Sequence, residues 1–240
     1  MTTRLIALLL LAAAAAMQAG PAAPHIVLLV DTSDSMTSHV PFRKGDRTLL
    51  TEAAVALAGA MRPDERAAVN SFGPALNISA AALEREALAS AAEALNDRTG
   101  GASPLWDALD AVVRSIETEA LRLGSGQALR PGSGQAGRRA IIVVTDGRTT
   151  GNTLSFADIL RRLEQAGVPV FFLCAERPKQ LTVADPSVRL RQIAAATGGQ
   201  YYAIGNYSGF AKPKPEEIRR AMDRALAAIR KSDDAVRSRG

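Results

Sequence analysis

The chain has 240 residues, of which 47% are hydrophobic and 22% are charged, the balance of a globular protein with one sizeable core. Its formal net charge is +5, but the basic residues are scattered, and no basic stretch is interleaved with aromatic residues as in nucleic-acid-binding motifs. We therefore expect a solvated basic surface and no nucleic-acid partner.

The N-terminal residues have the pattern of a secretory signal peptide. A short basic start, MTTR, precedes an apolar run at 5–17, and the small residues of QAGPAA then suit cleavage between Ala19 and Ala23. The apolar run is shorter than the roughly 20 residues that a membrane span needs. Residues 1–23 are predicted to be removed, with an uncleaved anchor as the alternative. The mature chain, without a membrane span, is then expected to be secreted, periplasmic or in the cell envelope.

Apolar strand-like runs alternate with helical patterns after residue 23. The sequence predicts strands at 25–31, 65–73, 74–79, 138–147, 168–175 and 200–205. It predicts helices at 48–61, 80–96, 104–123, 155–167, 187–199 and 216–231. A glycine-rich surface loop with a repeated GSGQ is expected at 124–137, and a disordered tail at 232–240.

Continuous apolar strands separated by amphipathic helices indicate a sheet that is covered on both faces. We therefore predict one doubly wound α/β domain over residues 24–231, with a mostly parallel central sheet. The strand at 74–79 follows its predecessor without a helix, which predicts one antiparallel edge strand. Cys174 is the only cysteine, so the chain cannot form an internal disulfide, and its neighbours in VPVFFLCA predict a buried strand position.

Oxygen-bearing side chains follow the predicted strands at the edge where such sheets bind ligands. Asp31, Ser33 and Ser35 end the first strand at alternate positions, Asp146 ends the strand IIVVTDG, and Ser103 precedes a predicted helix. Carboxylate and hydroxyl oxygens suit Mg²⁺ or Mn²⁺ and suit zinc poorly. These five residues are therefore predicted to form a metal site.

Each residue also has a purely structural interpretation. Ser103 could cap the helix that begins at Pro104, and Ser33 and Ser35 could cap the turn after their strand. Asp34 is expected to face solvent or to support the ligands from behind, and the same alternatives hold for Asp107. The convergence of three separate segments on one edge favours the metal site.

The segments DTSDSM, GGASPLWDAL and IIVVTDG, in that order, resemble the three segments of a von Willebrand factor type A (VWA) domain, over about residues 24–204. The resemblance implies a Rossmann-like fold with a metal-ion-dependent adhesion site. By that resemblance, Asp31, Ser33, Ser35, Ser103 and Asp146 hold one Mg²⁺. Ser103 stands where the family usually has Thr and lacks the methyl group that stiffens the side chain. Other segments, such as LRQIAAATGGQYY, resemble secreted bacterial relatives of the family.

The resemblance implies a binding module rather than an enzyme. In the family, a partner protein's Asp or Glu fills the coordination position that the five oxygens leave open. One alternative is an envelope scaffold with a vestigial metal site. Another is a Mg²⁺-dependent phosphoryl-transfer enzyme, but its D-x-D pattern would need an acid where Ser33 stands. The only histidines, His25 and His39, show no catalytic pattern.

Overall fold

A computed structural model of the chain describes residues 25–37, 48–79, 82–95, 101–122, 139–176, 185–206 and 214–238. The predicted signal peptide, the glycine-rich loop at 124–137 and His39 lie outside these residues. Two residues at the end of the predicted tail, 239 and 240, also lie outside them.

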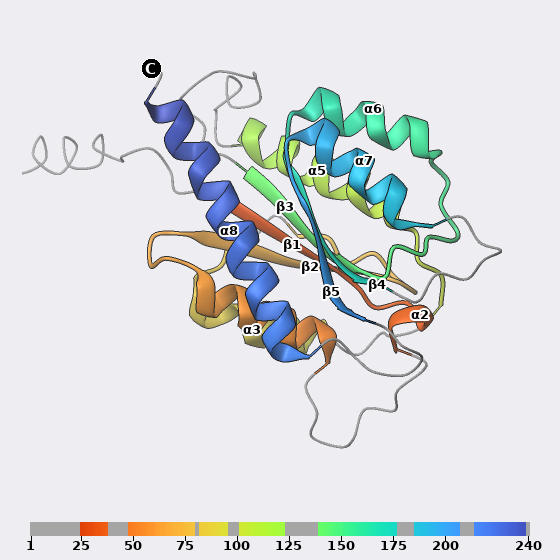
Figure 1. Cartoon of the computed structure of the whole chain (residues 1–240), viewed down its shortest axis with the longest axis horizontal. Helices are drawn as coiled ribbons and strands as arrows, with labels where there is room; N and C mark the ends of the chain where they lie inside the picture. The colour runs from red at the N-terminus through yellow and green to blue at the C-terminus, as the bar shows by residue number, and fades with distance from the viewer. Residues whose placement is uncertain are drawn as a thin grey trace, which may run out of the picture.

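Five parallel strands form one sheet in the order β2-β1-β3-β4-β5 (Figure 1). The strands are β1 (His25–Asp31), β2 (Arg66–Phe72), β3 (Arg139–Thr145), β4 (Val170–Glu176) and β5 (Tyr201–Asn206). Each parallel neighbour requires a crossover, and the helices between the strands provide it. The predicted doubly wound α/β fold is confirmed.

Helices cover both faces of this sheet (Figure 1). They are α2 (Asp34–Thr37), α3 (Leu49–Ala60), η1 (Arg85–Ala87), α4 (Leu88–Ala94), α5 (Leu105–Arg122), α6 (Phe156–Ala166), α7 (Ser187–Thr197) and α8 (Pro215–Arg237). Helices α5, α6 and α7 cover one face, and α3, α4 and α8 cover the other. Local signals set several ends: Ser155 accepts the Asp158 N–H at 3.2 Å to cap α6, and Gly167 ends it with a φ of 62°.

The apolar strands divide their side chains between two cores. In β1, Ile26, Leu28 and Val30 pack under α3, α4 and α8, whereas Val27 and Leu29 pack under α5, α6 and α7. Because both faces are buried, the strand shows a continuous apolar run rather than an alternating one. Cys174 is likewise buried in β4, as predicted.

The predicted antiparallel edge strand, one of the segments 65–73 and 74–79, is not confirmed, and the described residues contain only parallel strands. Two isolated antiparallel bridges join β2 to the following segment instead, Ser71 with Asn77 and Ala67 with Leu83. The two bridges are four residues apart on β2 (71 − 67) but six apart on the other segment (83 − 77). The two bridges are therefore out of register with each other, and the described residues show no continuous antiparallel ladder here.

The helix predicted at 80–96 is shorter in the structure, where η1 starts at Arg85 and α4 ends at Ala94. Leu83, within the predicted range, pairs with the sheet instead: it donates to the Ala67 carbonyl at 2.8 Å, and its carbonyl accepts the Ala67 N–H at 3.0 Å. Backbone groups used in this way cannot join a helix.

The last helix is longer than predicted. Helix α8 continues to Arg237 rather than ending near residue 231, so residues 232–237 are helical and do not belong to a disordered tail. This stretch contains neither Gly nor Pro, and the Ser238 N–H still bonds to the Asp234 carbonyl at 3.1 Å.

The strand order places a topological switch point between β1 and β3. From β1 the chain moves outward to β2 and then returns across β1 to β3, so neighbouring crossovers diverge at this point. Ligands of open α/β sheets bind at the carboxyl ends of the strands beside such a switch. Asp31 ends β1 here, and Asp146 directly follows β3.

Candidate functional site

The first segment of the site is the turn that follows β1. The Asp31 side chain is 1% exposed, and its Oδ1 accepts the Ser33 N–H at 3.0 Å. The hydroxyls of Ser33 and Ser35 share a hydrogen bond of 3.2 Å, because the short helix α2 begins directly after Ser33 and brings them to one side. Asp34, between them, is exposed. Side-chain oxygens thus gather at the strand end, as the D-x-S-x-S pattern predicts, with Asp31 and Ser33 buried and Ser35 partly buried.

The second segment reaches this carboxylate from 72 residues away. Ser103 Oγ donates to Asp31 Oδ2 at 3.0 Å, and Ser103 is 4% exposed. The Ser103 hydroxyl therefore donates to Asp31 and does not serve as the cap of α5, which was the structural alternative. Two of the three predicted segments meet through a direct hydrogen bond.

The third segment contributes Thr145 and Asp146. Thr145 Oγ1 donates to Asp31 Oδ2 at 2.8 Å and accepts the Gly147 N–H at 3.0 Å. Asp146 is 4% exposed, and its Oδ1 accepts the Arg148 N–H at 3.0 Å. Thr145 is absent from the sequence prediction, although a hydroxyl residue at the end of an otherwise apolar strand was a visible signal.

Burial and charge shape the electrostatics of the site. Removal from water raises the pKa of Asp31 to about 6, and the Asp146 charge also raises it, while hydrogen bonds from Ser33 and Thr145 oppose the rise. Two buried carboxylates that influence each other in this way favour a bound cation, which would offset their repulsion.

The donor set fits a hard divalent ion. It consists of carboxylate and hydroxyl oxygens, the ligand class that Mg²⁺ and Mn²⁺ prefer. Within the described residues, no group of three or more His, Cys, Asp or Glu side chains is arranged to hold a metal. A metal bound by two acids alone would need further ligands, and the hydroxyls of Ser33 and Ser103 lie beside the Asp31 carboxylate.

Glycines allow the loops around the site to approach closely. A Cβ on Gly73 would lie 2.7 Å from Thr32 Oγ1 and 3.0 Å from the Ser33 nitrogen. Thr32 is itself held by two bonds to the Phe72 carbonyl, at 2.7 Å from its N–H and 3.0 Å from its hydroxyl. The end of β2 therefore supports the Asp31 turn directly.

The loop at 148–154 holds the Ser103 and Asp146 segments together. Asp107, in the first turn of α5, accepts N–H bonds from Thr153 at 2.8 Å and Leu154 at 2.9 Å. Of the two roles expected for Asp107, the structure therefore gives it a supporting one. Trp106 is buried and packs against Phe156 with ring centroids 5.6 Å apart.

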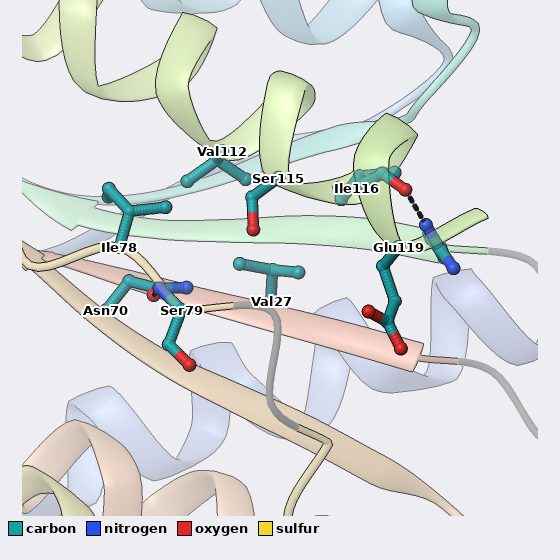
Figure 2. A pocket seen from close by; sticks show the side chains of 9 residues that line it. Val27, Asn70, Ile78, Ser79, Val112, Ser115, Ile116 and Glu119 are labelled. Atoms are coloured by element: carbon teal, nitrogen blue, oxygen red, sulfur yellow. Dashed lines mark hydrogen bonds between the residues drawn. The ribbon is translucent and has the colours of Figure 1, made fainter. Parts of the chain in front are cut away.

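A separate cavity of about 10 Å³ lies between the sheet and α5, lined among others by Val27, Asn70 and Ser115 (Figure 2). None of the five predicted site residues lines it. Val27 precedes Asp31 by four residues, which is about 13 Å along a strand. The buried Asn70 accepts the Ser79 N–H at 2.5 Å, and its Nδ2 has no protein partner among the described residues. The cavity has room for about one water molecule.

Comparison with known proteins agrees with this fold. Residues 25–213 match the von Willebrand factor type A domain family. Similar solved structures include human COPII-coat protein Sec24c (12% identity, TM-score 0.51), covering 85% of this chain and 32% of that one. Proximal thread matrix protein 1 from the mussel byssus (14%, 0.51) covers 85% and 46%. BatB from Bacteroides thetaiotaomicron, a conserved hypothetical protein (15%, 0.46), covers 85% and 98%.

At these identities the structural likeness shows the fold alone. This chain spans under half of Sec24c and of the byssus protein, and nearly all of BatB. A comparison with curated protein sequences gives no match. In the described part of the chain, no helix has the length and apolar character that crossing a membrane requires.

Proposed function

Because this chain belongs to the von Willebrand factor type A domain family, whose members are commonly protein-interaction modules, we propose that it is a metal-dependent protein-binding module. One observation carries the proposal. The hydroxyls of Ser103 and Thr145, which are 72 and 114 residues from Asp31, both donate to its Oδ2 at the switch point of the sheet. Such convergence is more than the capping of each turn requires.

Five residues would hold one Mg²⁺ or Mn²⁺ here: Asp31, Ser33, Ser35, Ser103 and Asp146. When bound, the ion supplies a Lewis-acidic position for an incoming oxygen ligand. The chain's own part is to bury the two carboxylates, to orient them by hydrogen bonds and to direct the hydroxyls toward them. Ser103 has no γ-methyl group, so it depends more on its surroundings for a fixed rotamer than a Thr would.

The partner is a protein that offers an Asp or Glu side chain. Mg²⁺ prefers six oxygens, and the five residues above leave one position for an outside ligand. Only two of the protein oxygens come from carboxylates, so the bound ion still attracts an acidic group. We further propose, from the signal-like pattern of the first 23 residues, that the protein acts outside the cytoplasm, in the envelope or the medium.

Metal binding by the purified protein tests the first step. We expect Mg²⁺ and Mn²⁺ to raise its thermal stability, by about 2.7 kcal/mol at a metal concentration 100 times the Kd. Asp146→Ala should abolish this gain. Asp34→Ala removes an exposed carboxylate from the same turn and is the matched control, which should keep it.

The other functions give different outcomes. If neither metal changes stability and Asp146→Ala has no effect, the scaffold with a vestigial site is favoured. If phosphoesters are hydrolysed in a manner that needs Asp31, the protein is an enzyme. For the partner, capture from an envelope fraction should depend on Mg²⁺, and EDTA should prevent it.

A further inference from the structure

Helix α5 begins beside the candidate site without a cap of its own. The Ala108 N–H bonds to the Pro104 carbonyl at 3.0 Å, which makes Pro104 the residue at the capping position. Proline has no side-chain oxygen, so it cannot accept the N–H groups that the first turn leaves without helical partners. Such N–H groups are commonly accepted by the side chain of a serine close by in sequence, and Ser103 is the serine nearest to the start of α5.

A distant residue supplies the missing cap. Asn152 Oδ1 accepts the Trp106 N–H at 2.7 Å, from 46 residues away. Its amide orientation is set by a second bond, in which Nδ2 donates to Thr149 Oγ1 at 2.5 Å. Asn is among the best capping residues, and here it acts from another loop.

The same loop fixes the backbone of Ser103 on both sides. The Ser103 N–H donates to Thr150 Oγ1 at 3.1 Å, and the Ser103 carbonyl accepts the Thr150 N–H at 2.9 Å. Thr149 Oγ1 also donates to this carbonyl at 2.9 Å. With these groups bonded, the Ser103 hydroxyl is the group that turns to Asp31.

We propose that Asn152, which caps α5 from outside, and Thr150, which holds the Ser103 backbone, are positioning residues that free the Ser103 hydroxyl for the metal site. This inference rests on the proposed function. A methyl group would restrict the Ser103 side-chain rotamer, and this arrangement compensates for its absence. Because the backbone is fixed and the helix is capped by Asn152, the Ser103 hydroxyl keeps Asp31 as its partner. It also couples two ligand segments, since the loop follows Asp146 directly.

Four substitutions in the full chain test this role. Asn152→Leu removes the outside cap, and Thr150→Val removes the acceptor for the Ser103 N–H while keeping the side-chain shape. The matched control is Thr153→Val on the same loop, which removes a hydroxyl bond of 3.1 Å to Asp107 and leaves the hydrogen bonds to Ser103 and Trp106 in place. Titration with Mg²⁺ should show affinity about tenfold weaker for the first two variants, as for other residues that orient metal ligands. Thr150→Ser, which keeps the hydroxyl, should restore the wild-type affinity.

A second readout works without metal. In metal-free protein, the Trp106 amide should exchange with solvent faster in Asn152→Leu than in Thr153→Val, and the Ser103 amide faster in Thr150→Val. Urea unfolding midpoints should resemble that of the control. If Asn152→Leu does not fold, Thr150→Val and Thr150→Ser still decide the question.

The outcomes separate the two proposals. If the wild type binds Mg²⁺ and the Thr150→Val and Thr153→Val variants bind it equally well, the positioning role is wrong and the proposed function stands. If the wild type binds neither Mg²⁺ nor Mn²⁺, the proposed function is wrong, and this inference is lost with it. Unchanged exchange of Trp106 in Asn152→Leu would overturn the outside cap independently of metal.

Discussion

Asp31 is the residue on which the site depends, and its burial has a cost in metal-free protein. Its pKa is raised from 3.8 to about 6, chiefly by burial. The folded state therefore binds this proton more tightly than the unfolded chain does. The contribution of Asp31 to stability is fully present below about pH 4 and is lost as the pH rises through about 6.

We predict that Asp31→Asn stabilises the metal-free protein at pH 8 by about 1–3 kcal/mol and much less at pH 4, because the amide carries no charge to bury. The variant should also bind no Mg²⁺. Urea unfolding in EDTA at both pH values measures the first effect. Asp34→Asn, at an exposed position of the same turn, should change stability little at either pH. An equal effect of Asp31→Asn at both pH values would contradict the assignment.

Gly73 is a second position where a single atom matters. A Cβ there would lie 2.7 Å from Thr32 Oγ1 and 3.0 Å from the Ser33 nitrogen, too close for the turn to keep its shape. We predict that Gly73→Ala weakens Mg²⁺ binding and destabilises the protein by about 1–3 kcal/mol, as overpacking typically does. Calorimetric titration and urea unfolding measure the two effects.

The control for this change is Gly59→Ala in α3, where a Cβ meets nothing within 4 Å. Alanine in this last turn of the helix should stabilise the protein by at most about 0.5–1 kcal/mol and leave metal binding unchanged. If both glycine variants behave alike, close approach at Gly73 is not a constraint on the site.

Among the helices, α8 is anchored by a buried ion pair. Arg230 donates to both Glu65 oxygens, at 2.7 and 2.6 Å, and to the Ala60 carbonyl at 2.8 Å. The Glu65 side chain is 2% exposed and that of Arg230 is 20% exposed. The pair therefore connects the last helix to the end of α3 and the start of β2.

We predict that Arg230→Met destabilises the protein by about 3 kcal/mol, the lower end of the range for a broken buried pair, because Glu65 loses its charged partner. The double variant Arg230→Met/Glu65→Gln should recover part of this loss, since no charge is then left buried. Urea unfolding of the wild type and the two variants gives the comparison. A double variant no more stable than Arg230→Met would show that packing, rather than the buried charge, dominates.

Element boundaries were predictable where a local signal sets them and not where the sheet competes. Ser155 and Gly167 mark the ends of α6 in the sequence and in the structure. The alanine-rich stretch before α4 looks helical by propensity, but Leu83 pairs with Ala67 of β2, a contact that no local pattern reveals. The antiparallel edge strand was not confirmed for a related reason, because its register also depends on pairing with β2.

At the scale of the domain, the meeting of the three segments could be predicted because parallel strands bring their carboxyl ends to one edge. Asp31 and Asp146 follow from this rule, and Ser103 follows from its motif. Thr145 shows a hydroxyl at a strand end, but its bond to Asp31 is seen only in the fold, and Asn152 has no comparable signal because its role lies in a contact with Trp106. Residues that hold the site residues in place through tertiary contacts do not belong to a recognisable sequence motif, so they are hard to predict.

This convergence makes a prediction about the molecule's response to metal. If one ion is held by three segments, binding must restrain all three together, because opening any one of them would break the site. Hydrogen exchange measured by mass spectrometry in Mg²⁺ and in EDTA should show slower exchange at 32–36, 101–106 and 145–154. Residues 66–68 and 139–141, at the amino ends of β2 and β3, should be unchanged. The same experiment on Asp146→Ala should show no protection, and protection confined to a single segment would mean that the ion is not shared.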